Sequence, residues 1–319
     1  MRPERDSCQT AMARFSALFL LASQMGVSQP VAIGAGPELP FPILLAPGQV
    51  TYLYARIDKT VPNVKAEGYP LPLALQGVSV WIGLTEPMRR MPLFSVEPMY
   101  PCRGREPVWD CDPIAAIRVQ VPVEFFTVDT NSQLVEAGRV WIEVDGKRSI
   151  PIAFSVRHNN PEFLTLCGPV SRKDIGRCPP EIWHADGTPV SSRRARPGDV
   201  LIVYAYGLGL TFPTPPSGEP APASTESSRF FQWLQPMRMI LDFRANAKVT
   251  TRPGPQSALV VVEPKFAGLV PGLAGLYQIN FVLPEPPLPL TPCPQVASNV
   301  TLSFPLLLEG ISFCIETGP

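Results

Sequence analysis

Two stretches of the chain that lie 150 residues apart carry the same local pattern. Residues 47–55 read PGQVTYLYA and residues 197–205 read PGDVLIVYA, so five of nine positions are identical. Each is a Pro-Gly turn followed by a run of β-branched and aromatic residues, which predicts a turn that leads into a β-strand. An echo at a fixed offset is typical of a duplicated unit. We therefore expect two tandem β-domains.

The rest of the chain reads as short strands separated by turns. Apolar residues alternate with polar ones at a period of two in several runs, and Asp145-Gly146 between two runs predicts a tight hairpin. No long amphipathic helical pattern is present. The expected strands are 50–57, 77–84, 117–126, 140–144 and 150–156 in the first unit, and 200–206, 237–243, 258–262, 276–283, 299–304 and 311–315 in the second. The fold class predicted is all-β, with two immunoglobulin-like β-sandwiches.

The N-terminal residues have the pattern of a secretory signal peptide. Three arginines within residues 2–14 precede the apolar run 15–22, and the small residues Gly26 and Ser28 predict cleavage before Gln29. No later run of 18 apolar residues occurs, so no transmembrane segment is expected in the mature chain. The predicted location is outside the cytoplasm, either secreted, periplasmic or at the cell surface.

The composition suits this organisation. Proline is abundant, with 41 residues, and it stands between apolar runs, as rigid turns between strands require. The formal net charge is zero and only 17% of residues are charged, so no basic field would attract nucleic acid. A turn-rich segment near residues 166–180 predicts the domain boundary. The division expected is a signal peptide at 1–28, domain 1 at 29–166 and domain 2 at 167–319.

Six cysteines remain after the predicted cleavage, as a disulfide framework in an exported protein would need. They allow 15 pairings. Pairing between sequence neighbours is the simplest, and each bond would contribute about 2–4 kcal/mol. A zinc site is the rival, but the chain has no Cys-x-x-Cys pair and only two histidines. No metal or cofactor is predicted, and the expected disulfides are Cys102–Cys111, Cys167–Cys178 and Cys293–Cys314.

Several motifs of the second unit occur together in a characteristic order: 185–188 (ADGT), 196–200 (RPGDV), 204–209 (YAYGLG), 266–272 (FAGLVPG), 275–284 (GLYQINFVLP) and 298–302 (SNVTL). Together they resemble the Solibacter-type uncharacterised C-terminal domain, an Ig-like module of secreted proteins of soil acidobacteria. The resemblance covers residues 181–304 and extends loosely to the first unit. It implies a secreted Ig-like tandem of unknown biochemical role and supplies no catalytic or ligand-binding residues. Tyr277, at a strand start, would anchor a neighbouring turn through its hydroxyl. The basic run 193–196 departs from the family pattern.

Enzymatic signals are weak. The pair Gly207 and Gly209 follows an expected strand, but no helix opens after it to bind a phosphate. No Gly-x-Ser-x-Gly or His-Glu-x-x-His motif occurs. A hydrolase would have to use His158 or His184, because they are the only imidazoles in the chain. We predict no catalytic residue.

Two tryptophans stand out on the expected strands of domain 1. In residues 78–82 three aliphatic side chains share one face and Trp81 points to the other, and residues 140–144 place Trp141 in the same way. Two outward indoles would form a platform for a sugar ring or a partner protein. The alternative, which we favour, is that the second domain or the Pro-rich segment 29–46 covers them.

The sequence therefore predicts a secreted, non-enzymatic module that is structural, adhesive or protein-binding at the cell envelope, with an unknown protein or polysaccharide as its partner. The alternative is a carbohydrate-binding protein that uses Trp81 and Trp141. A third class is a hydrolase or enzyme accessory domain, which would require a cleft beside His158 or His184. Exposed indoles would favour the second class, and buried indoles the first.

Overall fold

The first half of the chain folds as a sandwich of two sheets. The computed structural model describes residues 30–35, 43–57, 60–83, 88–99, 114–125, 137–165, 179–223, 229–230, 237–247, 256–293, 295–304 and 310–316. One sheet has the order β1 (Val31–Ala35), β3 (Val50–Arg56), β8 (Ile114–Gln120), β7 (Leu93–Met99) and β4 (Val64–Lys65). The other has the order β2 (Ile43–Leu45), β11 (Ile152–Val156), β9 (Ala137–Val144), β5 (Val78–Gly83) and β6 (Arg89–Arg90), with β10 (Lys147–Arg148) beside β9.

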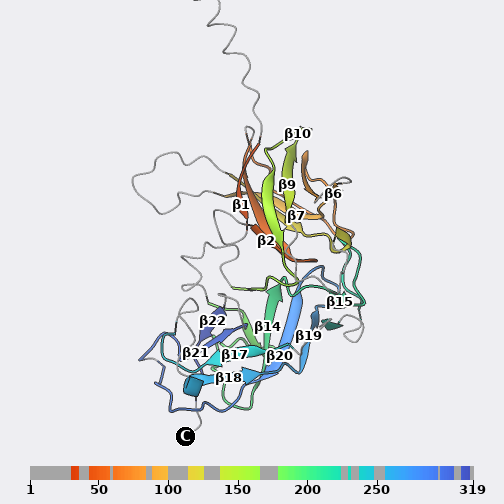
Figure 1. Cartoon of the computed structure of the whole chain (residues 1–319). Helices are drawn as coiled ribbons and strands as arrows, with labels where there is room; N and C mark the ends of the chain where they lie inside the picture. The colour runs from red at the N-terminus through yellow and green to blue at the C-terminus, as the bar shows by residue number, and fades with distance from the viewer. Residues whose placement is uncertain are drawn as a thin grey trace, which may run out of the picture.

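The second half repeats this architecture. Its larger sheet has the order β12 (Glu162–Phe163), β14 (Val200–Tyr206), β20 (Tyr277–Val282), β19 (Phe266–Leu269), β16 (Arg229–Phe230) and β15 (Thr211–Phe212), with β13 (Ile182–His184) also on β14. Its smaller sheet has the order β18 (Leu259–Val262), β17 (Met239–Asp242), β21 (Val300–Ser303) and β22 (Gly310–Phe313). The only helical elements among the described residues are two short 3-10 turns, Val123–Phe125 and Gln256–Ala258. The predicted all-β fold of two tandem immunoglobulin-like sandwiches is confirmed (Figure 1).

The repeated Pro-Gly pattern of residues 47–55 and 197–205 forms equivalent turns and strands in the two halves, with equivalent hydrogen bonds. The amide of Gly48 donates to Val121 O at 3.0 Å, and the amide of Gly198 donates to Leu283 O at 2.8 Å. Both glycines have positive φ, +70° and +89°, which is why the turn uses glycine. The turns lead into β3 and β14, which pair antiparallel with β8 and β20. Each half thus starts its central strand pair in the same way.

Each sandwich encloses its own hydrophobic core because alternate residues of its strands point inward. In β5, Val78, Val80 and Ile82 are fully buried, and in β14 Leu201 and Val203 are. The first core continues to Val156 and the second begins with Phe163. The change of core therefore falls in the short connection 157–161, before the predicted division at 166/167, which lies outside the described residues.

That connection is fixed by glycines of the second sandwich. The amide of Asn160 donates to Gly207 O at 2.7 Å, and its side-chain amide donates to Leu44 O at 3.0 Å. A Cβ on Gly207 would lie 2.2 Å from Asn160 O, and one on Gly209 would lie 2.3 Å from His158 O. Only glycine allows this approach, so the pair is a packing feature and not a phosphate loop.

A further loop of the second sandwich, which contains Ser217 and Gly218, contacts the first. The amide of Gly218 donates to Gln120 Oε1 and the amide of Leu71 donates to Gly218 O, at 2.7 and 2.8 Å. Glu124 accepts hydrogen bonds from the amide and the hydroxyl of Ser217. Figure 1 shows the first sandwich, with β7 and β9, above the second, with β14 and β20 leading up to this junction.

Strand ends differ from the sequence expectation where proline intervenes. The strand expected at 117–126 is β8, which begins earlier, at Ile114, and ends at Gln120 ahead of Pro122. Proline cannot donate a ladder hydrogen bond, and a 3-10 turn follows it. The strand expected at 200–206 coincides with β14, and Asp145-Gly146 forms the expected turn with both φ values positive. The predicted signal peptide, 1–28, lies outside the described residues.

Candidate functional site

Trp81 and Trp141 lie opposite each other on neighbouring strands of the first sandwich. The antiparallel register of β5 and β9 pairs Trp81 with Trp141, and β6 places Arg90 opposite Trp81 on the other side. The aliphatic neighbours Val80 and Ile142 are fully buried, whereas both tryptophans are half-buried. The two indoles therefore belong to the outer face of this sheet, away from the core.

Guanidinium groups lie against the ring of Trp81. The Cζ atoms of Arg90 and Arg148 are each 4.5 Å from the ring centroid. Such contacts are favourable because the cation meets the negative potential above the π system. Arg148 reaches this position from β10, and its Nε donates to Glu143 Oε2 at 2.8 Å. The sequence predicted either an outward indole or one covered by the second domain or by the Pro-rich segment 29–46, whereas among the described residues the Trp81 ring contacts arginines of its own sheet.

Glu143 completes this arrangement. Ser79 Oγ donates to Glu143 Oε1 at 3.4 Å, and the hydrogen bond from Arg148 is the main cause that lowers the pKa of the Glu143 carboxyl. The carboxylate therefore stays charged and holds Arg148 in place. We define the Trp81 face as the outward side chains of this part of the sheet: Ser79, Trp81, Arg90, Arg139, Trp141, Glu143 and Arg148.

The Trp81 face carries more positive than negative charge. It has three arginines against the single carboxylate of Glu143. Arg90 and Arg139 are exposed, and neither makes a salt bridge within the described residues, although the charge of Arg90 also helps to lower the pKa of the Glu143 carboxyl. The indole Nε1 of Trp81 is buried and likewise has no hydrogen-bond partner within the described part of the chain. The face thus combines indoles with two exposed guanidinium groups, those of Arg90 and Arg139, that can bind an anion.

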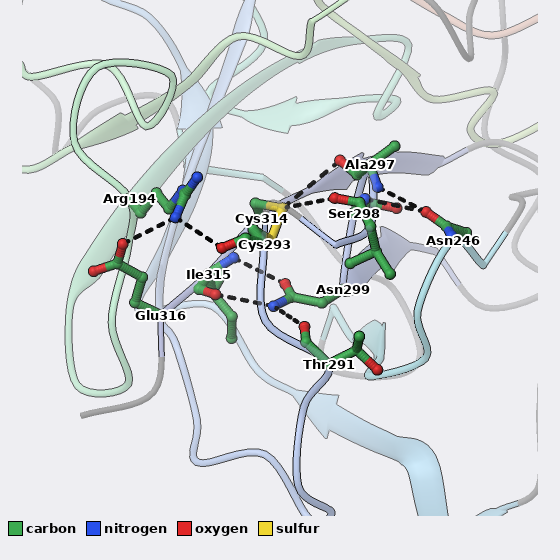
Figure 2. The surroundings of a disulfide bond; sticks show 11 residues. Arg194, Asn246, Thr291, Cys293, Ala297, Ser298, Asn299, Cys314, Ile315 and Glu316 are labelled. Carbon is green, nitrogen blue, oxygen red and sulfur yellow. Dashed lines mark hydrogen bonds and ion pairs between the residues drawn. A yellow bond between two sulfur atoms is a disulfide. The ribbon is translucent and has the colours of Figure 1, made fainter. Parts of the chain in front are cut away.

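The Cys293–Cys314 disulfide predicted from neighbour spacing is present, with the Cα atoms 6.3 Å apart. Figure 2 shows it beside Asn299, whose side-chain amide donates to Ile315 O at 2.9 Å and to Thr291 O at 3.3 Å. The fully buried Asn299 also accepts from the amide of Ile315. The other predicted pairs, Cys102–Cys111 and Cys167–Cys178, lie outside the described residues.

The basic run 193–196 is paired with carboxylates. Arg194 and Arg196 lie 3.2 and 3.4 Å from the Glu316 carboxylate, and Arg193 lies 2.8 Å from Asp186. Arg194 also donates to Cys293 O (Figure 2). Arg194 and Arg196 therefore hold the 193–196 loop against Glu316 near the disulfide, whereas Arg193 pairs with Asp186.

The two histidines lie in separate, unrelated surroundings. His184 is 3% exposed; its Nε2 is 2.8 Å from Arg193 O, and its Nδ1 is 3.5 Å from Asp199 Oδ2. Both ring nitrogens thus face groups that hold a turn. His158 is exposed in the connection between the sandwiches. Neither is joined to a nucleophile by any contact among the described residues, so the geometry required of a Ser-His-Asp site is missing there.

A small pocket lies at the junction between the sandwiches. Gly48 and Gln120 of the first half line it together with Gly209, Gly275 and Tyr277 of the second. It has room for about one water molecule, so it is a packing gap rather than a substrate site. The Tyr277 hydroxyl, which is buried there, donates to Gly209 O, as the predicted anchoring role requires.

No family model and no curated protein matches this chain. Among solved structures, the full extracellular region of plexin A4 aligns over 93% of the chain at 9% identity with a TM-score of 0.21. The chain spans about a quarter of that region's length, 26%. A structure described as BspA_C_mut aligns over 76% of the chain and 78% of its own length, at 7% identity and a TM-score of 0.18. Similarities this low carry no argument about function.

Within the described ranges, no group of three or more His, Cys, Asp or Glu side chains is placed to hold a metal ion. No helix in the same ranges is long and apolar enough to cross a bilayer.

Sequence reasoning missed a cation held by aromatic rings at the junction. The Cζ of Arg118 in β8 lies 4.9 Å from the centroid of Phe94, 5.4 Å from Tyr206 and 6.0 Å from Tyr52. Arg118 also donates to the Tyr206 hydroxyl. Tyr206 belongs to the second sandwich, so this contact crosses the junction. A sequence signal for this contact was present, because Arg118 is the one charged residue of the strand that pairs with the Tyr52 strand.

Proposed function

We propose that this chain is a secreted, non-enzymatic module whose two β-sandwiches act as one rigid unit at the cell envelope, in a structural, adhesive or protein-binding role. The observation that carries the proposal is the junction. Backbone hydrogen bonds of Gly207 and Gly218 and the Arg118–Tyr206 contact join the halves. Domains linked in tandem move relative to each other by default unless their interface prevents it. A fixed angle between the two domains suits such a module, because it keeps the partners that bind to the two domains at a constant separation.

The proposal includes the extracellular setting and the domain division. The Cys293–Cys314 disulfide supports an oxidising compartment, because such bonds are rare in the cytosol. The N-terminal signal-peptide pattern points the same way. A mature chain of two domains that starts at residue 29, with the division taken at the connection 157–161, and membership of the Solibacter-type family on the motifs of residues 181–304 are parts of the same proposal.

Small-angle X-ray scattering on the exported chain tests the rigidity. One arrangement of the sandwiches should fit the profile, and the same profile should be obtained over a range of salt concentrations. A profile that requires an ensemble with widely different separations of the two halves would refute the proposal. Fractionation of cells that express the full chain tests the location, since recovery in the cytosol alone would contradict an envelope role.

A second candidate function is carbohydrate binding, and the Trp81 face favours it. The half-buried indole of Trp141 offers an apolar area beside the polar groups of the face, which suits the face of a sugar ring. This candidate is independent of the rigid junction, because all residues of the face belong to the first sandwich.

A further inference from the structure

We infer that the Trp81 face binds a linear acidic polysaccharide whose sugars carry carboxylate groups. This inference rests on the second candidate function, carbohydrate binding, and names its ligand class. Three features of the face support it: the row of side chains across the strands, the unpaired guanidinium groups, and the stacking that orients one of them.

The row runs across three neighbouring strands. Arg90 of β6, Trp81 of β5 and Trp141 of β9 stand directly opposite one another in the register. Neighbouring strands lie about 4.8 Å apart, so the row extends over about 10 Å. An extended row of this kind fits consecutive units of a chain molecule better than a single compact ligand.

The charges on the face select an anion. Arg90 and Arg139 are exposed and make no salt bridge within the described residues, whereas Arg148 is hydrogen-bonded to Glu143, whose carboxylate Arg90 influences only at longer range. Guanidinium groups bind carboxylates through two parallel hydrogen bonds, which gives direction as well as attraction. Because Arg90 and Arg139 flank the tryptophan pair, a polymer with regularly spaced carboxylates can contact both.

The two tryptophans have different roles in this arrangement. The ring of Trp81 is in contact with guanidinium groups at 4.5 Å and holds Arg90 in one orientation, so less side-chain freedom is lost when the anion binds. No cation lies over the ring of Trp141 among the described residues, so Trp141 is the indole available to a sugar ring. Trp81 is therefore a positioning residue, and Trp141 contacts the ligand.

Isothermal titration of the full exported chain with polygalacturonate and with alginate tests the inference. The neutral comparison is fully methyl-esterified polygalacturonate, which has the same sugar backbone without the charge, and the non-sugar comparison is polyglutamate. The variants are Arg90→Gln, Arg139→Gln and Trp141→Ala. Arg157→Gln is the matched control, because Arg157 is an exposed arginine that directly follows the last strand of the first sandwich and lies outside the Trp81 face.

The expected result is binding of at least one polyuronate, about tenfold weaker in each face variant and unchanged in Arg157→Gln. Added salt should weaken the binding, since the exposed charges are screened. Arg90→Lys keeps the positive charge but loses the paired guanidinium N–H donors and the planar group that lies on the Trp81 ring. This variant should therefore also bind the polyuronate more weakly.

Four results would overturn the inference. Equal binding of the methyl ester would refute the acidic class but leave carbohydrate binding intact. Equal binding of polyglutamate would reduce the face to a general polyanion site. Binding that all face variants retain would place the site elsewhere, and a lack of binding to both polyuronates would refute the acidic ligand outright. None of these results affects the scattering test of the rigid junction.

Discussion

The junction predicts a sharp difference between two alanine substitutions in one loop. Gly272 and Gly275 both have positive φ, +75° and +67°. Around Gly272 nothing lies within 4 Å of an added Cβ. An added Cβ on Gly275 would lie 2.6 Å from Val50 Cγ2 and 2.8 Å from Gly48 O, both in the first sandwich. The backbone oxygen cannot rotate away, so the loop or the sandwich has to move.

The expected loss in the free energy of unfolding combines a cost of backbone strain and a cost of overpacking. Alanine at a left-handed position costs about 1–2 kcal/mol, and both variants incur this cost. Overpacking adds about 1–3 kcal/mol, and only Gly275→Ala incurs it. We therefore expect Gly275→Ala to lower the free energy of unfolding by about 1–3 kcal/mol more than Gly272→Ala does.

Urea unfolding of both variants measures this difference, with the slope as a check that the transition itself is unchanged. Scattering should show a changed separation of the halves for Gly275→Ala alone. The reasoning is refuted if both variants lose the same stability and both keep the wild-type scattering profile, because the contact across the junction would then be absent in solution.

Three further predictions address other parts of the molecule. Cys293→Ser should lower the free energy of unfolding by about 3 kcal/mol, since the bond to Cys314 closes a loop with a sequence separation of 21, and a denaturant titration that finds no loss would contradict the disulfide. The Glu124 carboxyl has a lowered pKa because Ser217 donates two hydrogen bonds that outweigh the opposing effect of burial. Its stabilising contribution is complete above the unfolded value near 4.5 and is lost as the pH falls through the lowered folded value. Stability measured between pH 6 and 3 should therefore fall less steeply in Glu124→Gln than in the wild type. Export of the full chain by a bacterial host should yield a mature N-terminus at Gln29, which N-terminal sequencing checks.

Much of the fold follows from local sequence rules. The Pro-Gly turns at 47–48 and 197–198 predicted where the central strands begin, because only glycine adopts the required φ without strain. Period-two alternation predicted β5, β9 and β14 because each has one face on a core. Short edge strands such as β4, β6 and β10 were not predicted, since two residues leave no measurable period.

The candidate site was predicted only in part, for a similar reason. Alternation along a single strand showed which face Trp81 takes, because that depends on its own neighbours in sequence. The groups that contact its ring come from β6 and β10, and their position depends on the register between strands. Register is set by long-range pairing and turn geometry, which no local pattern specifies.

The two functional proposals also differ in whether they depend on contacts within one sandwich or on contacts between the two. The rigid junction depends on contacts between segments far apart in the chain, such as Gly218 with Gln120 and Tyr206 with Arg118. These contacts join two sandwiches that each have a complete core, so their loss would leave both halves folded but free to move. The Trp81 face lies wholly within one sandwich and would survive that loss. A variant that loosens the junction should therefore keep polyuronate binding, whereas a face variant should keep the scattering profile, and each role can be removed without the other.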